Sequence, residues 1–389
     1  MPGPLEGVRV VEVAGLGPVP YAGLLLAELG ADVARVDRSD QVGVPEGGVA
    51  PMASLHRSRP SLAVDLKSEA GRSTVLRLVE QADVLLEGMR PGVMERLGLG
   101  PDVCLARSPG LVYGRMTGWG QDGPLASAAG HDITYAALSG ALHVTGPPEK
   151  PYPAANLVAD FGGGTLFLVV GVLAALQSRH RTGVGQVVDA AMVDGAASLL
   201  TLVYGLLGSG WADERGSNLL DGGCPFYDSY RCADGRFVAI GPLEPPFYAA
   251  LLAGLGVTFV TAQYDRSGWP EQRRVLTEVF ATRTRDEWVE HFAGTDACVA
   301  PVLALGEAPD HPHLAARDTF VEVDGHRVPR VAPRFSATPG LDPTPARPAG
   351  ADTRAVLAHW GFGDDEVEDL IVSGAVAQAA GDDALGSRP

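Results

Sequence analysis

Lysine is almost missing from this chain, in which only Lys67 and Lys150 occur among 389 residues. The formal net charge of −17 also excludes the broadly basic surface that binding to nucleic-acid phosphates requires. We therefore expect no nucleic-acid partner. Nearly all positive charge is carried by arginine, whose guanidinium group suits bidentate phosphate contacts in a local pocket. A GC-rich genome would produce the same bias toward arginine.

Cysteine is also scarce, and long hydrophobic runs are absent. The four cysteines, Cys104, Cys224, Cys232 and Cys298, form no C-x-x-C pair and are typical of reduced structural thiols. The N-terminus carries no basic and apolar secretory signal. Apolar stretches such as Leu166–Leu176 are too short to span a bilayer. These features predict a cytoplasmic protein without a membrane partner.

The length and composition favour a folded protein of two domains, with 46% apolar and 20% charged residues. In the first third of the chain, short β-branched runs alternate with stretches of helical apolar spacing. The expected strands are Val8–Val13, Asp32–Val36, Leu62–Leu66, Asp83–Leu86 and Leu111–Met116. Strands separated by helices predict parallel βαβ units, and hence an α/β fold.

The rest of the chain gives a different pattern. Gly- and Ala-rich segments from Ile133 to Gln177 and from Val187 to Leu207 are expected to be buried helices. Phe226–Cys232 and Phe237–Ile240 flank a turn and predict a β-hairpin. A proline-rich linker precedes what we expect to be the last helix, Asp352–Trp360. The predicted domains are residues 1–207 with 322–389, and residues 221–321.

Two proton carriers stand next to small residues. Gly130-His131-Asp132 contains an imidazole, and Asp160 precedes the run Gly162–Gly164. Two bases that face one carbon could remove a proton from one side and return it to the other. A histidine and an aspartate at this spacing occur by chance in most proteins, so the spacing alone is not evidence of a catalytic pair.

Two other motifs have weaker functional meaning. Gly15–Pro20 follows a strand, as a dinucleotide-binding loop does, but Pro20 replaces the third glycine and the prolines remove N–H donors for pyrophosphate. His311-Pro312-His313 lacks nearby cysteine or glutamate ligands, so we interpret it as a loop and expect no metal. Serine-nucleophile, P-loop and zinc-protease motifs do not occur.

A group of arginines follows the second expected strand. Solvated surface arginines are the default interpretation, but arginines at the ends of parallel strands lie where ligands usually bind. Phosphate recognition is therefore an equal alternative. The group comprises Arg35, Arg38, Arg57 and Arg59, with Arg90 and Arg96 further on.

Taken in order, many segments resemble the family III CoA-transferase superfamily, and within it the α-methylacyl-CoA racemases. The segments are Pro4–Glu12, Leu29–Arg38, Val64–Ser68, Glu87–Arg96, Gly118–Pro124, Thr182–Asp189 and His313–Val321. At the position of His131, transferases usually carry no histidine, whereas racemases carry Gly-His-Asp. Racemases also carry a glutamate in the smaller domain, which Glu244 matches. The resemblance therefore favours a racemase.

The resemblance implies a Rossmann-like large domain with a parallel sheet, a smaller α+β domain, and two chains interlocked into a dimer. Each site would combine His131 and Asp160 of one chain with Glu244 of the other. The CoA moiety would lie near Arg38, Arg57, Arg59, Glu87, Gly88, Met89, Arg96 and Gly130.

The implied reaction is inversion at C2 of a 2-methylacyl-CoA thioester through an enolate, without metal or redox cofactor. His131 and Asp160 would exchange the roles of acid and base, the backbone N–H of Asp132 would stabilise the enolate, and Glu244 would orient His131. Three alternatives stay open. They are CoA transfer with Asp160 as nucleophile, CoA binding without catalysis, and an NAD-dependent oxidoreduction.

Overall fold

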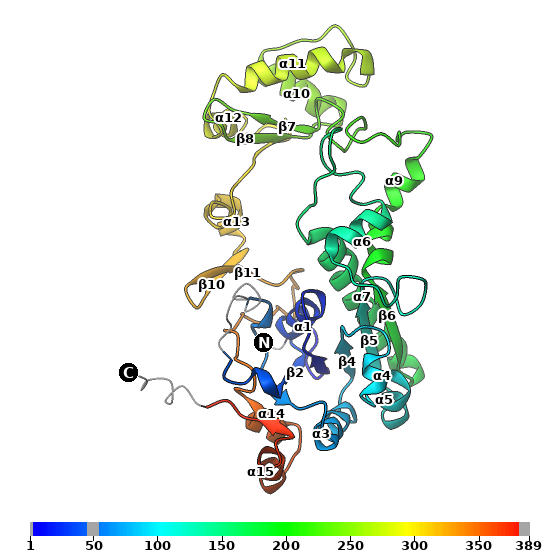
Figure 1. The fold of residues 1–389 in the computed structure, drawn as a ribbon. Helices are drawn as coiled ribbons and strands as arrows, with labels where there is room; N and C mark the ends of the chain where they lie inside the picture. The colour runs from blue at the N-terminus through cyan, green and yellow to red at the C-terminus, as the bar shows by residue number, and fades with distance from the viewer. Residues whose placement is uncertain (1–2, 45–53, 381–389) are drawn as a thin grey trace. The chain divides into compact units, whose positions relative to one another are not determined.

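The chain divides into two compact units, which we describe separately (Figure 1). The structure is a computed structural model and describes residues 3–44 and 54–380. Unit 1 contains Met1–Ser139, Ala155–Leu199 and Ala316–Pro389, and unit 2 contains Gly140–Ala154 and Leu200–Ala315. The chain therefore crosses between the units four times. The sequence-based boundaries assigned residues 140–154 to the large domain, whereas here they belong to unit 2.

Unit 1 is built on a seven-stranded sheet with the order β12-β3-β2-β1-β4-β5-β6. Six strands are parallel, and β12 pairs antiparallel with β3 at one edge. The bounds are β1 (Arg9–Val13), β2 (Asp32–Arg38), β3 (Ser61–Val64), β4 (Val84–Glu87), β5 (Val112–Thr117), β6 (Gln186–Ala191) and β12 (Val376–Ala377). This is the strand order of a Rossmann-like fold, and the predicted α/β class is confirmed.

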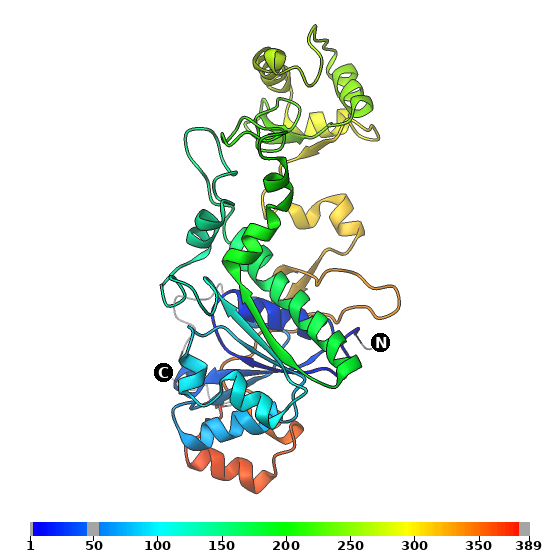
Figure 2. The same cartoon turned by 90° about the vertical axis from the view of Figure 1, so that its right-hand side faces the viewer.

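Helices cover both faces of this sheet because its central strands are apolar on both sides. One face packs on a core shared by α3 (Glu69–Val79), α5 (Pro101–Arg107), α14 (Thr353–His359) and α15 (Asp364–Val372). The other face carries α1 (Pro18–Glu28) and α7 (Leu166–Thr182). Figure 2 shows α7, in green, running along its side of the sheet. The strand order changes direction between β1 and β4, where such folds bind ligands.

Two sequence-based predictions for unit 1 are wrong. Val187–Leu207 does not begin as a helix, because Gln186–Ala191 forms β6 and pairs in parallel register with β5. The β-branched pair Val187-Val188 fits a strand at the sheet edge. The helix at Asp352–Trp360 is not the last one, since α15 and β12 follow α14.

Unit 2 contains a three-stranded antiparallel sheet in the order β7-β8-β9. Its strands are β7 (Asp228–Arg231), β8 (Phe237–Ile240) and β9 (Val299–Pro301), and β7 and β8 form the predicted hairpin. The helices α10 (Pro245–Leu255), α11 (Trp269–Phe280) and α12 (Arg285–His291) pack on it. Phe280, Trp288 and Phe292 form a continuous aromatic cluster in this core.

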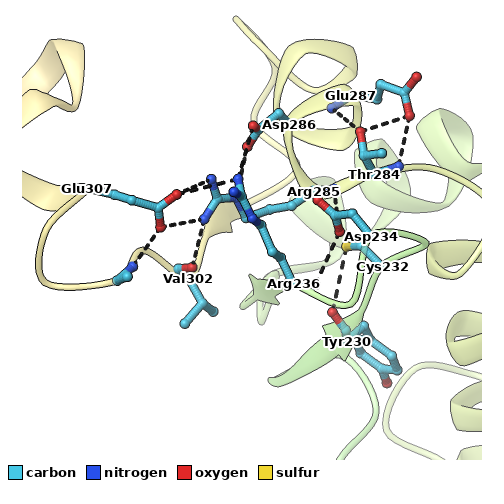
Figure 3. Close-up of polar contacts among 11 residues, drawn as sticks. Tyr230, Cys232, Asp234, Arg236, Thr284, Arg285, Asp286, Glu287, Val302 and Glu307 are labelled. Carbon is cyan, nitrogen blue, oxygen red and sulfur yellow. Dashed lines mark hydrogen bonds and ion pairs between the residues drawn. The ribbon is translucent and has the colours of Figure 1, made fainter.

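Arg285 anchors the chain that leaves β9 (Figure 3). Its buried guanidinium group donates two hydrogen bonds to the carboxylate of Glu307, both at 2.9 Å, and one to Asp286 at 2.8 Å. The paired guanidinium lowers the pKa of Glu307 to about 2. Thr284 and Glu287 form a reciprocal capping box at the start of α12. Together these contacts hold the segment after β9 against α12.

Candidate active site

His131 lies immediately before α6 (Asp132–Ser139) in unit 1. Its backbone N–H donates to Thr134 Oγ1 at 3.0 Å, and its carbonyl accepts the Thr134 N–H at 2.8 Å. These contacts fix the first turn of α6. The imidazole is exposed and makes no hydrogen bond within residues 3–44 and 54–380. It is therefore free to meet a ligand.

The carboxylate of Asp132 joins α6 to a distant segment. Asp132 is buried, and its Oδ1 accepts the backbone N–H groups of Ala159 at 2.9 Å and of Asp160 at 2.8 Å. The N–H groups at the start of a helix such as α6 have no acceptor within the helix, so they are available to a ligand oxygen. Asp132 thus presents its N–H at this end of α6 and its carboxylate toward Asp160.

Asp160 lies in η2 (Leu157–Thr165), a π-helical segment that continues into α7. π-Helical turns are rare and occur frequently at functional sites. The Asp160 carboxyl group is half-buried, and burial followed by the nearby charge of Asp132 raises its pKa to about 6. A hydrogen bond from Asn156 and the charge of His131 oppose this rise. The predicted proton carriers are therefore electrostatic neighbours.

Glycines allow η2 to pack closely on α8 (Met192–Leu199). A Cβ atom at Gly195 would come within 1.8 Å of the carbonyl oxygen of Gly163. Any larger residue at position 195 would therefore push η2 and α8 apart. On the opposite side, Thr165 Oγ1 donates to the carbonyl of Pro18 at 2.8 Å. The glycine run after Asp160 therefore has a packing role.

The loop after β1 borders Asp160. Gly17 has a φ of +61°, and a Cβ atom there would lie 3.8 Å from Asp160 Oδ2. The prolines that weaken a dinucleotide fingerprint stand in the first turn of α1, where a missing N–H costs nothing. Val19 also touches Gly88, which follows β4. Asp160 is thus placed at the switch between β1 and β4.

The segment Glu87–Met89 is held in place by hydrogen bonds to the buried carboxylate of Glu87. Glu87 is buried, and its carboxylate accepts the Met89 N–H at 2.7 Å and the Arg115 Nε–H at 2.9 Å. Burial raises the pKa of Glu87 in spite of these donors. The carboxylate therefore points inward, while Gly88 is exposed to solvent.

The predicted phosphate-binding arginines fall into two groups. Arg57 and Arg59 are buried against the carboxylates of Glu28 and Glu12, at 2.7 and 3.3 Å. Arg38 is exposed and pairs with Asp40 at 2.5 Å. Arg96, in the short helix α4 (Val93–Arg96), is also exposed. Only the second group offers its charge to solvent.

Glu244 belongs to unit 2, where it is exposed just before α10. Its charge contributes to raising the pKa of Cys298 and of Tyr264, although burial is the larger cause for both. Cys298 lines a cavity of about 990 Å³ within unit 2, together with Tyr227 and Ile240. Glu244 is therefore near enough to act electrostatically on Cys298, one of the residues that line this cavity.

No group of three or more His, Cys, Asp or Glu side chains suited to a metal ion occurs within the described residues. His311 and His313 flank the start of α13 (Pro312–Ala316). There the His313 N–H donates to His311 Nδ1 at 3.3 Å. The motif serves as a helix start.

The sequence reasoning missed several polar residues that build this site. Asn156 was inside the segment that drew attention to Asp160, but nothing marked its side chain. Arg115 lies inside β5 and gives no motif. Gly130, by contrast, was predicted, and a Cβ atom there would come within 2.5 Å of the Tyr135 ring.

Comparison with known proteins agrees with this geometry. Residues 5–353 match the family model described as CoA-transferase family III. The chain is 46% identical to the alpha-methylacyl-CoA racemase of Mus musculus and 43% identical to that of Homo sapiens, each over 94% of this chain and 96% of the relative.

Solved structures give the same result. A CaiB/BaiF family protein from Brucella suis superposes with a TM-score of 0.80 at 26% identity, over 92% of this chain and 100% of that one. A hypothetical protein from Mycobacterium tuberculosis gives a TM-score of 0.77 at 30% identity, over 91% of this chain and 98% of that one. The resemblance inferred from the sequence is confirmed, and the chain belongs to CoA-transferase family III.

Proposed function

We propose that the protein is a racemase that inverts C2 of 2-methylacyl-CoA thioesters by proton transfer through an enolate. The observation that carries this proposal is the pair of different proton carriers, His131 and Asp160, on segments joined by Asp132. The relatives named as racemases are 43–46% identical to the chain, whereas a succinyl-CoA–L-malate CoA-transferase subunit of Chloroflexus aurantiacus is 29% identical. Both facts favour racemisation over CoA transfer.

The enolate is the demanding part of the reaction. A thioester carbonyl acidifies its α-proton, but an unaided side chain could not remove it, so the negative charge must be stabilised as it forms. The backbone N–H of Asp132, at the positive end of α6, would donate a hydrogen bond to the enolate oxygen.

The two bases must be in opposite protonation states. When His131 removes the proton, Asp160 must already carry one to return on the other face, and the reverse holds for the other enantiomer. Burial, followed by the charge of Asp132, raises the pKa of Asp160 to about 6, so its carboxyl group holds a proton more readily than an ordinary aspartate does.

We propose that the CoA moiety lies outside the carboxyl ends of β1 and β4. Gly88, Met89 and Gly130 would contact it there, with Glu87 holding the backbone of its loop. Arg38 and Arg96 would pair with its phosphates. Arg57 and Arg59 could do so only by leaving the buried carboxylates of Glu28 and Glu12.

The proposed assembly is an interlocked homodimer in which Glu244 of the partner chain orients His131. An apolar surface on unit 1 supports it. Large apolar side chains stand exposed on α7, β6 and α8, namely Leu166, Phe167, Val170, Val187 and Leu199. The continuous helical stretch Leu157–Thr182 is long and apolar enough, by length and composition alone, to cross a membrane, and only 39% of its most apolar 18-residue window is buried. Because it carries Asp160 and packs on β5 and β6, we propose a second copy of the chain as its cover.

The reaction is tested with (2R)- and (2S)-2-methylacyl-CoA in deuterated water. Mass spectrometry and chiral analysis should show deuterium at C2 and inversion from either enantiomer. His131→Ala and Asp160→Ala should each abolish inversion. His359→Ala, which removes an exposed histidine paired with Asp32 at the amino end of β2, is the matched control and should retain activity. No exchange from either enantiomer would rule out the racemase.

The shared site has its own test. His131→Ala and Glu244→Ala chains, each inactive, are refolded together so that mixed dimers form. If Glu244 acts across the dimer, one of the two sites in each mixed dimer is intact, and about a quarter of wild-type activity should return. If both residues act within one chain, no activity returns.

CoA transfer makes a different prediction. Attack by Asp160 on the thioester would release CoA thiolate and leave an acyl-aspartyl anhydride. Return of the thiolate to the aspartyl carbonyl would release the free acid and leave an aspartyl-CoA thioester, which hydroxylamine converts to a hydroxamate at residue 160 with release of CoA. Peptide mass spectrometry after incubation with acyl-CoA and hydroxylamine should find this product only if the protein is a transferase.

We also propose that the protein works in the cytoplasm. The structure leaves Cys104, Cys224, Cys232 and Cys298 as free thiols, which suits a reducing compartment.

A further inference from the structure

We propose that the side-chain carboxylate of Asp132 is a positioning residue for the second base: it fixes Asp160 in place and opposes the loss of its proton. This inference rests on the proposed function for its catalytic meaning. It adds a role for Asp132 that is separate from its backbone N–H, which would face the enolate.

The geometry of the contact carries the proposal. Asp132 Oδ1 accepts two successive backbone N–H groups, of Ala159 at 2.9 Å and of Asp160 at 2.8 Å. Two donors converging on one oxygen fix the direction of the π-helical turn from which the Asp160 side chain leaves. The bonded residues stand 27 and 28 positions apart in the chain; the bond from Ala159 is buried and the bond from Asp160 is partly buried.

A carboxylate does more here than a neutral acceptor would. An asparagine Oδ1 could accept the same two N–H groups, so the hydrogen bonds alone do not require a charge. A negative charge held beside Asp160 makes a second negative charge there less favourable, and its effect on Asp160 is exceeded only by that of burial.

The other groups around Asp160 do not replace this effect. His131, just before α6, favours the ionised form of Asp160, and the hydroxyl of Tyr135 within α6 lies near enough to respond to its charge. Asn156 donates a hydrogen bond that also favours ionisation. The α1 side contributes Gly17 and the uncharged ring of Tyr21, which packs on Phe161 at 4.8 Å.

The helix α8 also packs on η2, and its acidic residue is Asp194. Its charge is not among the causes that act on Asp160. Asp132 is thus the acidic side chain of the described residues that raises the proton affinity of Asp160.

One residue would then serve both halves of the reaction. Its N–H would stabilise the enolate. Its carboxylate would position Asp160, the group that protonates that enolate, and would oppose the loss of the Asp160 proton. Because both groups belong to Asp132, the distance between enolate donor and base is fixed by a single residue.

The test compares Asp132→Asn, which keeps the acceptor and removes the charge, with the wild type. The primary readout is the titration of Asp160, followed by carboxyl-carbon NMR of protein labelled in aspartate and assigned with Asp160→Asn. We expect the midpoint of Asp160 to fall by about one pH unit in Asp132→Asn. Asp194→Asn is the matched control and should leave it unchanged. An unchanged midpoint in Asp132→Asn would overturn the inference.

The catalytic readout is the pH profile of deuterium exchange from the enantiomer that Asp160 deprotonates. In Asp132→Asn, the acid limb should move down by about one unit and kcat should fall about tenfold. KM should stay within about twofold, since CoA contacts are unchanged. A rise in KM with an unmoved acid limb would mean that Asp132 is only structural. The NMR titration decides the inference even if the wild type shows no exchange, so the two failures are distinguishable.

Discussion

At the scale of single residues, the carboxyl group of Asp160 makes the folding stability of the protein depend on pH. Its carboxyl group is half-buried next to another carboxylate, and its pKa is raised from the usual 3.8 to about 6. The folded state therefore binds this proton more tightly than the unfolded chain does. Stability from this group is greatest in acid and is lost as the pH rises through about 6.

Asp160→Asn should consequently stabilise the protein above pH 7. A rise from 3.8 to about 6 corresponds to about 3 kcal/mol for a fully buried group, which the half-exposed position reduces to about 1.5 kcal/mol. Urea unfolding at pH 8 and pH 5 measures the difference between variant and wild type. The gain should be larger at pH 8. A gain of equal size at both values would contradict a raised pKa.

At the scale of elements, α1 is packed around an ion pair in the core. Glu12 on β1 and Arg59 are fully enclosed, and burial raises the pKa of Glu12 and lowers that of Arg59. Arg59 also donates to the carbonyl of Pro20 at 2.5 Å. Gly23 of α1 faces this pair, and a Cβ atom there would lie 1.9 Å from Glu12 Oε2.

Gly23→Ala should therefore destabilise the protein by about 2–4 kcal/mol, although alanine is the better helix former. The added methyl group would displace a buried carboxylate from its partner. Gly205, in α9 (Thr201–Leu206), has open space around it and is the matched control. Gly205→Ala should be neutral or stabilising by up to about 1 kcal/mol. Chemical denaturation of both variants measures the change in the free energy of unfolding. Equal changes would show that the close approach of Glu12 to Gly23 does not exclude a methyl group there.

The elements also show how far the sequence could predict this structure. Val10-Val11 and Leu85-Leu86 predicted strands because buried parallel strands are continuously apolar. Val187-Val188 was assigned to a helix because its alanine-rich neighbours gave no strand boundary. His131 and Asp160 were predicted from family motifs. The two backbone contacts of Asp132 Oδ1 were not, because they depend on a π-helical turn whose position no local pattern indicates.

At the scale of the whole molecule, the exposed apolar surface of α7 is the feature most in need of a partner. Val170 is 64% exposed in the middle of this helix, among Leu166 and Phe167. A charge placed there would have to be desolvated if a second chain covers the helix.

Val170→Asp should weaken or abolish the proposed dimer, with a dissociation constant raised at least about tenfold. Sedimentation velocity over a range of protein concentrations measures this. Val372, at the end of α15, is 84% exposed and provides the control, since Val372→Asp should leave the dimer intact. A wild-type monomer at all concentrations, or equal behaviour of the two variants, would contradict the proposed interface.

The return of the chain to unit 1 has a consequence for how the protein folds during synthesis. Trp360 of the last third is fully buried in the core beneath the sheet, where Arg9 stacks on its ring at 3.9 Å, and β12 closes the edge of β3. The ribosome must therefore have released residue 376 before β3 has both of its neighbouring strands, β2 and β12. Until then β3 presents an open edge to other nascent chains. Unit 2, whose residues end at Ala315, can finish earlier, so the catalytic sheet is the last part of the molecule to become complete.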